Sequence, residues 1–331
     1  MDIKTVMKKL PRERLACLPT PLGRLYATEK SLDSPVKLYI KRDDLTGVGS
    51  GGNKVRSLEY ILGEAKAAGC DTVVASGGDQ SNLCSLAAAC CAKAGLKCQL
   101  VHNSEKHLHK IGNQLLNQLL ETDTIYMGKT DSSQREKYVH IVMQALKDRG
   151  DKPYLIRNGA TTGAGALGYV NAVFELESQC KEQKLQIKHI FAPGGNGGIA
   201  TGLIYGNALL GFPYKVHIIS VEDDKPTLIE HIENTIKEVC EITKLPFDFK
   251  VEEAADIVEE YRGEGWSFNT PESEKEVLSF AKAEGIYIEN VYTSKLMVGF
   301  KDMVKKGVVD GDSVVFHTGG LGSLFAQYPQ L

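Results

Sequence analysis

The sequence predicts an α/β protein built on open, twisted, mostly parallel sheets with helices on both faces. Short runs of β-branched residues alternate with amphipathic runs of helical periodicity along nearly the whole chain. This alternation is typical of strand–helix–strand units, in which helices pack over neighbouring parallel strands. At 331 residues and 42% hydrophobic content, the chain is long enough to form a large core divided between two lobes.

The individual elements follow from the periodicity. Strands are predicted at residues 36–40, 72–75, 98–101, 124–127, 154–156, 187–192, 215–220 and 313–316. Helices are predicted at residues 55–68, 80–94, 107–120, 132–148, 163–181, 198–210, 226–243, 272–284 and 294–306. Residues 244–253 are less regular, and we expect an edge strand or an excursion there. No internal repeat or linker is present, so the lobes should be interwoven rather than strung along the chain.

Charge and composition exclude several classes of function. The chain carries 39 basic and 42 acidic residues, and its net charge of −3 has no basic stripe that would suit nucleic acid. No apolar run approaches the roughly 20 residues of a membrane span, and the N-terminus lacks the apolar core of a secretory signal. The eight cysteines show neither metal-ligand spacing nor a disulfide framework. We therefore expect a cytoplasmic protein with no nucleic-acid or membrane partner and no metal site.

The first candidate functional residue is Lys54, which follows the glycine-rich turn Gly51–Gly52–Asn53 and opens a predicted helix. Glycines leave room for a ligand against the main chain. The positive end of the helix dipole repels an ammonium group, and together with burial this repulsion would lower the pKa of Lys54. A neutral amine attacks carbonyl groups, so Lys54 is a candidate nucleophile. Taken alone, the pattern also fits an ordinary surface lysine after a flexible loop.

A second glycine cluster, Gly194 to Gly198, follows the predicted strand 187–192 and opens the next helix. Bare N–H groups at a helix N-terminus form a ready site for phosphate, although a tight strand-to-helix turn could also require glycines. The spacing Gly47-x-Gly49-x-x-Gly52 matches a dinucleotide fingerprint, but four charged residues separate it from the strand. That fingerprint requires a tight turn directly after the strand, so we reject it here.

A third turn, Gly77 to Asn82, has the same position between strand and helix. Its hydroxyl and amide side chains and its helix N-terminus suit a substrate carboxylate, although Ser and Asn are also common helix caps. The C-terminal run His317 to Gly322 repeats this strand–glycine–helix layout. A lysine, a phosphate cup and a carboxylate site are together what an enzyme needs to hold pyridoxal 5'-phosphate through an imine.

At this point the sequence resembles a known family, the D-cysteine desulfhydrases and 1-aminocyclopropane-1-carboxylate (ACC) deaminases. These are pyridoxal phosphate enzymes of fold type II, the tryptophan synthase β type. The resemblance extends from Leu18 to Pro329 and rests on Lys41–Arg42–Asp43–Asp44, Gly51–Gly52–Asn53–Lys54, Gln80–Ser81–Asn82, Gly165–Ala166–Leu167–Gly168 and Val291–Tyr292–Thr293–Ser294–Lys295. It implies a small inserted domain at residues 57–162 and a large cofactor-binding domain built from residues 1–56 and 163–331, with the cofactor in the cleft between them. It also implies a homodimer.

The resemblance assigns roles to matching residues. Lys54 would be the Schiff-base lysine and the base that removes the substrate's α-proton. Asn82 would bind the ring hydroxyl oxygen of the cofactor, and Ser81 and Gln80 would bind the substrate carboxylate. Tyr292 would lie at the ring and the substrate. The remaining expected cofactor contacts are Asn53, Gly194, Gly195, Asn196, Gly197, Gly198, Ile199, Thr293, Thr318 and Gly319, and Asp79 and Trp266 are further expected substrate contacts.

Three residues depart from the family pattern. Thr293 stands where ACC deaminases carry a glutamate. A hydroxyl cannot hold the pyridine nitrogen protonated as a carboxylate does. A hydrogen bond to a neutral ring nitrogen suffices for β-elimination, but it argues against cyclopropane opening. Trp266 replaces a usual tyrosine, and an indole donates a hydrogen bond without transferring a proton. Ile199 replaces a usual threonine in the phosphate loop, which loses one hydroxyl contact.

These observations predict a β-eliminating lyase that degrades a small amino acid, with D-cysteine as the leading substrate and pyruvate, sulfide and ammonia as products. Alternatives with the same cofactor are L-cysteine, L-cysteate or another β-substituted alanine, which Trp266 and Asp79 motivate. Asp79 could repel a substrate carboxylate or select a cationic group. ACC deaminase is a weaker alternative because of Thr293. A binding protein that retained the fold and lost catalysis is the alternative from another class.

Overall fold

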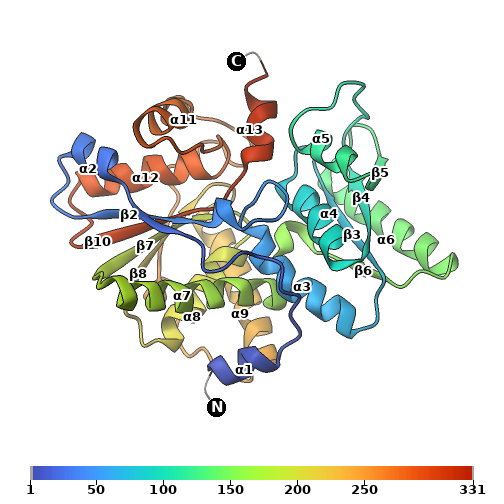
Figure 1. The fold of residues 1–331 in the computed structure, drawn as a ribbon, viewed down its shortest axis with the longest axis horizontal. Helices are drawn as coiled ribbons and strands as arrows, with labels where there is room; N and C mark the ends of the chain where they lie inside the picture. The colour runs from blue at the N-terminus through green and yellow to red at the C-terminus, as the bar shows by residue number, and fades with distance from the viewer. Residues whose placement is uncertain (1–2, 330–331) are drawn as a thin grey trace.

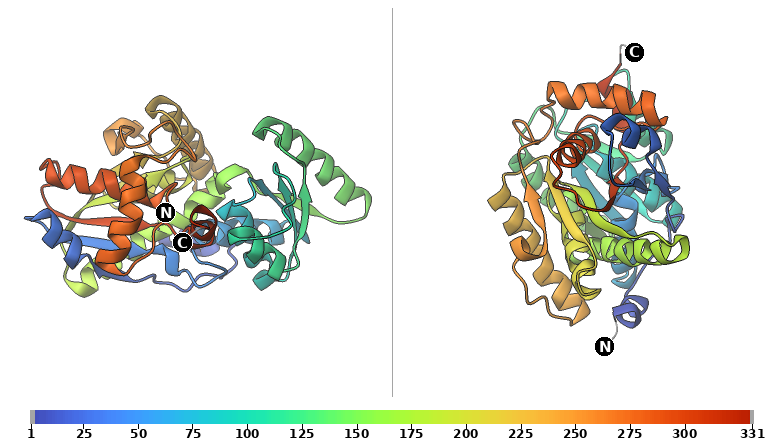
Figure 2. Two further views of the ribbon diagram at one scale, coloured as in Figure 1. Left: turned by 90° about the horizontal axis from the view of Figure 1, so that it is seen from above. Right: turned by 90° about the vertical axis from the view of Figure 1, so that its left-hand side faces the viewer.

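The computed structural model describes residues 3–329 and contains two sheets, each covered by helices on both faces (Figure 1). The larger sheet has the strand order β1-β2-β10-β7-β8-β9, and the smaller has the order β5-β4-β3-β6. The two sheets form lobes that lie side by side in Figure 1 and again in the view from above in Figure 2. The predicted fold class is therefore confirmed.

The larger sheet is parallel except for its first strand, which pairs antiparallel with β2. Its strands are β1 (Leu22–Arg24), β2 (Leu38–Arg42), β7 (Ile187–Gly194), β8 (Lys215–Ser220), β9 (Asp256–Val258) and β10 (Asp312–His317). The smaller sheet is parallel throughout, with β3 (Thr72–Gly77), β4 (Lys97–His102), β5 (Asp123–Tyr126) and β6 (Pro153–Leu155). Because the carboxyl ends of parallel strands share one edge, the loops that follow them converge there.

The helices occupy the intervals between the strands. They are α1 (Ile3–Lys9), α2 (Tyr26–Leu32), α3 (Lys54–Ala67), α4 (Asn82–Ala94), α5 (Gly112–Leu119), α6 (Ser132–Asp148), α7 (Gly163–Gln183), α8 (Gly198–Leu209), α9 (Lys225–Thr243), α10 (Val251–Ala254), α11 (Pro271–Glu284), α12 (Thr293–Lys305) and α13 (Leu321–Gln327), with short 3-10 turns at Asp43–Leu45 and Asn158–Ala160. Within residues 3–329, none of these helices is long and apolar enough to cross a membrane.

Alternating residues of the central strands pack into different cores. In β7, Ile190 and Ala192 join one core with residues of α3, α7 and α8, whereas Phe191 joins another with residues of α11 and α12. In β3, Val73 packs toward α4, and Val74 packs toward α6. Successive side chains of a strand point to opposite faces, so strands that are apolar at every position require helices on both sides.

Some boundaries differ from the prediction. The strand predicted at residues 36–40 is β2, which extends through Lys41 and Arg42, and the helix predicted from residue 107 begins at Gly112. The irregular stretch 244–253 leads through α10 to the edge strand β9. All four strands of the smaller sheet lie between residues 72 and 155, while the domain boundaries at 56/57 and 162/163 stay a prediction.

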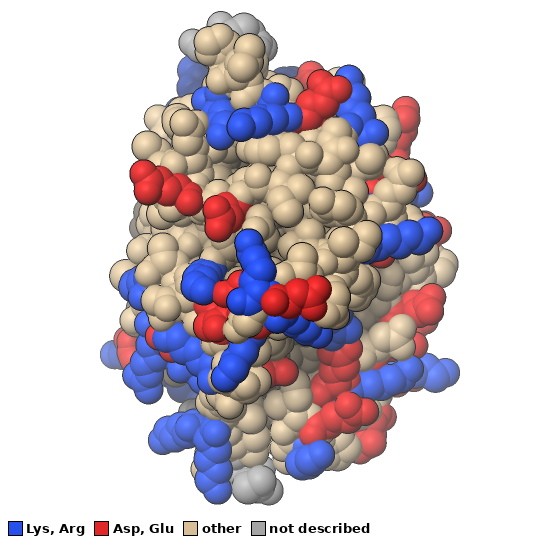
Figure 3. Space-filling model, turned by 90° about the vertical axis from the view of Figure 1, so that its right-hand side faces the viewer, with Lys and Arg blue, Asp and Glu red and all other residues tan. Residues whose placement is uncertain are grey.

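The outer face of the smaller lobe carries both signs of charge. Figure 3 shows Lys and Arg side chains interspersed with Asp and Glu across this face. Interspersed charges of this kind form no single-sign field that would steer a polyanion to this face.

Candidate active site

The glycine cluster after β7 forms an open helix N-terminus. Gly197 has a φ of +86°, which glycine adopts without strain, and α8 begins at the next residue without a side-chain cap. A Cβ at Gly194 would lie 2.7 Å from side-chain atoms of Ile218 and Leu228, so this position has no room for a side chain. The N–H groups of the first turn of α8 are thus available to an anion at the carboxyl edge of the sheet.

Lys54 is the first residue of α3, and the main chain just before it is bound to the end of β10. The N–H of Asn53 donates to the carbonyl oxygen of Thr318 over 2.9 Å, and Gly52 pairs with Gly319 in an antiparallel bridge. These contacts place Asn53, Thr318 and Gly319 beside Lys54, while their expected contacts with a cofactor stay a prediction.

The amine of Lys54 has one acceptor, the carbonyl oxygen of Gly159, at 2.7 Å. Burial lowers the pKa of Lys54 to about 8, and the negative charge of Glu222 opposes this shift. Near neutral pH more of the amine is therefore uncharged than in an ordinary lysine, which favours a role as nucleophile or general base.

The turn at residues 158–161 joins Lys54 to the glycine loop. A Cβ at Gly159, the residue that binds Lys54, would lie 2.5 Å from Oδ1 of Asn196. A Cβ at Gly198 would lie 3.3 Å from Oγ1 of Thr161. The lysine and the helix N-terminus that suits a phosphate thus meet across one short turn.

An aromatic pair connects the glycine loop to the smaller lobe. Nε1 of Trp266 donates a hydrogen bond of 2.7 Å to Oη of Tyr292. The ring of Tyr292 lies 3.5 Å from the Cβ position of Gly195, and the ring of Trp266 lies 4.0 Å from that of Gly78. Burial raises the pKa of Tyr292, and the nearby charge of Glu222 adds to the shift, so this phenol keeps its proton at neutral pH.

Thr293 begins α12 beneath this pair and is only 1% exposed. Its Oγ1 has no hydrogen-bond partner of normal geometry among the described residues. The backbone there is held by Glu289, whose carboxylate accepts from the N–H groups of Val291, Tyr292 and Thr293. A rigidly placed hydroxyl without a partner inside a site is a group that a ligand could satisfy.

Glu222 is a site carboxyl group that the sequence interpretation missed. It lies two residues after the end of β8, and its Oε2 lies 3.2 Å from the Cβ position of Gly195. Burial and the charge of Asp223 raise the pKa of Glu222, and hydrogen bonding from Asn196 and the charge of Lys54 oppose the shift. The available signal was its position at the carboxyl end of a buried parallel strand, where site residues gather.

The residues predicted for substrate binding on the smaller lobe have partners within that lobe. Ser81 caps α4 by accepting from the N–H of Cys84. The side chains of Gln80 and Asn82 both bond to Asn113 at the start of α5, and Asp79 accepts from Gln114 and pairs with His107. Gln80, Asn82 and Asp79 thus contact α5, and Ser81 caps α4. Among residues 3–329 none of the four is hydrogen-bonded to Lys54, so their substrate roles stay a prediction.

The residues present fit a phosphorylated aldehyde cofactor. The glycine cradle and the uncapped α8 suit a phosphate, Lys54 supplies an amine of lowered pKa, and Thr293 carries an orphaned hydroxyl. Half-exposed Ile199, in the first turn of α8, contributes its backbone only. This combination defines an enzyme class that binds an anionic cofactor through a lysine.

Comparison with known proteins identifies the class. The family model described as pyridoxal-phosphate dependent enzyme matches residues 14–319. The chain therefore belongs to this family, and its relatives place it among the lyases that include the D-cysteine desulfhydrases and ACC deaminases.

The relatives carry both of these names. A putative ACC deaminase of Pyrococcus abyssi is 35% identical over 324 residues, covering 98% of this chain and 96% of the relative. A D-cysteine desulfhydrase of Salmonella paratyphi B is 31% identical over 342 residues, covering 98% of each chain. A crystal structure of an ACC deaminase homologue superposes with a TM-score of 0.90 at 31% identity, covering 99% of this chain and 97% of that one. This similarity supports the fold type II architecture predicted from the sequence.

Proposed function

We propose that the chain is a pyridoxal phosphate-dependent β-eliminating lyase that converts D-cysteine and water to pyruvate, hydrogen sulfide and ammonia. The observation that carries this proposal is Thr293, a buried hydroxyl at the position expected near the pyridine nitrogen. A hydroxyl can share a hydrogen bond with a neutral ring nitrogen but cannot hold it protonated. β-Elimination needs less electron withdrawal than ring opening, because the leaving group takes electrons with it.

In this proposal Lys54 holds the cofactor covalently and later removes the substrate's α-proton. Its lowered pKa supports both roles. When bound, pyridoxal phosphate supplies the electron sink for the charge that develops at the α-carbon. The backbone from Gly194 to Ile199 holds the phosphate, and Asn53, Thr318 and Gly319 keep Lys54 in place.

The aromatic pair supports a role at the substrate. Trp266 holds the phenol of Tyr292 in one orientation through its indole N–H. The raised pKa of Tyr292 keeps the phenol protonated, so it can donate a hydrogen bond at the β-substituent. We also propose that Ser81, Gln80 and Asn82 turn toward the substrate carboxylate and the cofactor's ring oxygen when these are bound, with Asp79 at the edge of the pocket.

L-Cysteate, L-cysteine and other β-substituted alanines remain the second candidates, and Trp266 and Asp79 favour a pocket that differs from the family's commonest one. Glu222 disfavours cysteate in particular, because a carboxylate near a sulfonate repels it. ACC deaminase activity is the third candidate, since several relatives carry that name.

The test is to incubate the purified, cofactor-loaded protein with D-cysteine, L-cysteine, L-cysteate and ACC, each in a separate reaction. Pyruvate with sulfide from D-cysteine alone is the expected result. Pyruvate with sulfite from L-cysteate would mean that the reaction is a β-elimination but that cysteate is the substrate. 2-Oxobutyrate from ACC would contradict the argument from Thr293. Bound cofactor without turnover of any amino acid would favour a binding protein, and absence of bound cofactor would reject the whole proposal.

We further propose that the protein is a cytoplasmic homodimer, which the resemblance to the family supports. Light scattering during gel filtration would measure the mass directly. A mass near the 36.2 kDa of one chain would contradict the dimer.

A further inference from the structure

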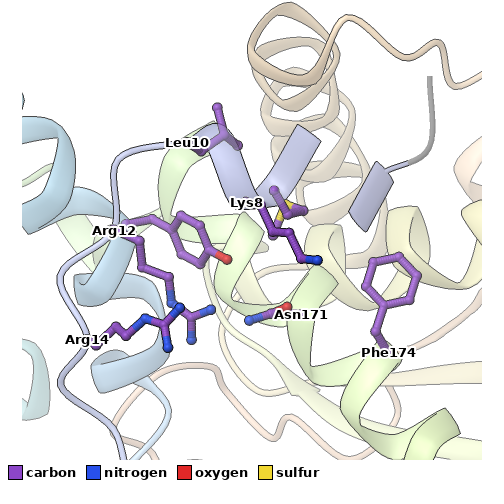
Figure 4. A pocket seen from close by; sticks show the side chains of 8 residues that line it. Lys8, Leu10, Arg12, Arg14, Asn171 and Phe174 are labelled. Atoms are coloured by element: carbon purple, nitrogen blue, oxygen red, sulfur yellow. The ribbon is translucent and has the colours of Figure 1, made fainter. Parts of the chain in front are cut away.

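A second cavity, of about 340 Å³, lies away from the glycine loop, where α1 and the following segment meet α3 and α7. Figure 4 shows Arg12 and Arg14 on one side of it and Phe174 on the other, with Lys8 and Asn171 between them. The proposed reaction uses none of these residues. Three cationic side chains thus line a cavity that has no role in the proposed reaction.

The charges around this cavity do not balance. Arg12 is neutralised by Glu59, whose Oε2 accepts from Nε and Nη2 of Arg12 over 2.9 and 2.6 Å. The other oxygen of Glu59 accepts from the N–H groups of Leu15 and Ala16, so this carboxylate has no capacity left for a second cation. Among residues 3–329, no ion pair is formed by Lys8 or Arg14. Two exposed cations therefore line the cavity without an ion pair to any described residue.

Tyr60 contributes a buried polar atom to the same cavity. The residue is 2% exposed, and its Oη donates to no acceptor within the described chain, although the guanidinium group of Arg12 lies close enough to that oxygen to oppose the rise of its pKa. Arg12 approaches the face of the Tyr60 ring, 5.1 Å from its centroid. Burial raises the pKa of Tyr60 to about 12, so the phenol is a hydrogen-bond donor at neutral pH. A buried donor without an acceptor costs free energy that a bound acceptor would recover.

The rest of the cavity is apolar. Met7, Leu10 and Phe174 contribute the apolar part of its wall, and Phe174 lies on the side away from Arg12 and Arg14 (Figure 4). A ligand that fills the space therefore needs an anionic group at one end and an apolar part at the other.

We propose that this cavity is a second ligand site, for a small molecule that carries a phosphate group on an apolar body. Two cations without an ion pair, the Tyr60 hydroxyl and the Asn171 amide line this one cavity and offer several donors to a ligand in it. A phosphate accepts more hydrogen bonds and carries more charge than a single carboxylate, so it suits this set better. Tyr60 lies six residues after Lys54 on α3, which corresponds to roughly 9 Å along the helix axis. A bound ligand would therefore contact α3, the helix whose first residue is Lys54.

The test is calorimetric titration of the cofactor-loaded protein with phenyl phosphate, and with benzoate for comparison, at constant ionic strength. Loading with cofactor keeps the phosphate site at α8 out of the measurement. Phenyl phosphate should bind once per chain and about tenfold more tightly than benzoate. Equal binding of the two probes, or no saturable binding of phenyl phosphate, would overturn the proposal.

Three variants locate the site. Tyr60→Phe removes only the orphaned oxygen and should weaken phenyl phosphate binding about fivefold, and Arg14→Ala should weaken it about tenfold. Lys9→Ala is the matched control, because Lys9 is an exposed neighbour of Lys8 that does not line the cavity. Unchanged melting temperatures establish that the variants are folded. A loss of binding in Lys9→Ala as large as that in Arg14→Ala would show a diffuse surface charge effect and contradict a built site.

Discussion

Two lysines close together in the sequence have opposite surroundings. Lys41 is fully buried, and its amine donates to the carbonyl of Thr20 and to side-chain oxygens of Glu175 and Gln179. Lys54 donates to a single carbonyl oxygen, that of Gly159. All three protons of Lys41 are used, whereas Lys54 keeps two for other partners.

The neighbours of the two lysines differ in the same way. Around Lys41, the guanidinium group of Arg56 binds both Asp43 and Glu175, and Tyr169 also donates to Asp43. Burial alone would raise the pKa of Glu175, but Arg56 and Lys41 lower it to about 2. By contrast, Glu222, whose charge acts on Lys54, has a raised pKa, and Oγ1 of Thr293 has no hydrogen-bond partner of normal geometry among residues 3–329. A saturated network anchors the fold, and an unsaturated one is available to a ligand.

The largest effect should come from removing the unsaturated lysine. Lys54→Ala should abolish covalent cofactor binding and lower turnover by about 10³-fold or more, because the attacking amine and the base are lost together. Lys66→Ala on the same helix is the control and should leave cofactor binding and turnover unchanged. Cofactor absorbance and pyruvate release measure the outcome, and substantial turnover by Lys54→Ala would contradict the assigned role.

Removing one member of the saturated network should instead destabilise the fold. Arg56→Met leaves the buried carboxylate of Asp43 without a cation and that of Glu175 with Lys41 alone, which we expect to cost about 3–5 kcal/mol. Urea unfolding followed by circular dichroism measures the loss. A change below about 1 kcal/mol would mean that this network is not an anchor.

Neutralising Glu222 tests the carboxyl group beside the glycine loop. Glu222→Gln should tighten binding of pyridoxal 5'-phosphate about fivefold near pH 8 and leave pyridoxal, which lacks the phosphate, unchanged. Because the pKa of Glu222 is raised, the carboxyl group becomes neutral as the pH falls through that pKa, and the advantage of the variant should then disappear.

The control for this experiment is Asp223→Asn, which removes the adjacent charge without touching the glycine loop and should have the smaller effect. Binding is read from quenching of protein fluorescence. An equal gain for pyridoxal would show that Glu222 acts at the ring and not at the phosphate.

The smallest effects should come from Thr293→Val. The stability of the cofactor-free protein should not fall, whereas binding of the cofactor should weaken. Removing an orphaned buried hydroxyl should leave the melting temperature of the cofactor-free protein unchanged or slightly higher. Cofactor affinity should fall about threefold, because the ring nitrogen loses its partner. A lower melting temperature of the cofactor-free variant would show that the hydroxyl has a structural role.

Local sequence signals were sufficient for much of the fold and part of the site. Local patterns marked the glycine turn before α8 and the glycine turn before Lys54, because these features are written within a few residues. The charged run Lys41–Asp44 was interpreted as separating a strand from its glycines, but Lys41 lies within β2 and Asp43 is buried. Their partner Glu175 lies more than a hundred residues further along the chain, where no local pattern indicates the contact.

Glu222 shows that local sequence patterns also fail to indicate long-range contacts within the candidate site. Its neighbours Gly195, Lys54 and Tyr292 come from three distant segments, so only the folded chain reveals the cluster. The side chains of Gln80 and Asn82 were predictable as polar groups of a helix N-terminus, but their bonds to Asn113 required the position of α5.

The anchor at Arg56 also has a thermal consequence. Charged groups lose hydration free energy on heating, so the cost of keeping the network of Arg56, Asp43 and Glu175 away from water falls as temperature rises. Arg56 lies two residues after Lys54 in the first turn of α3. The helix turn that carries the reactive amine is therefore held by interactions that heat weakens less than it weakens ordinary surface contacts, and it should be among the last parts of the molecule to loosen.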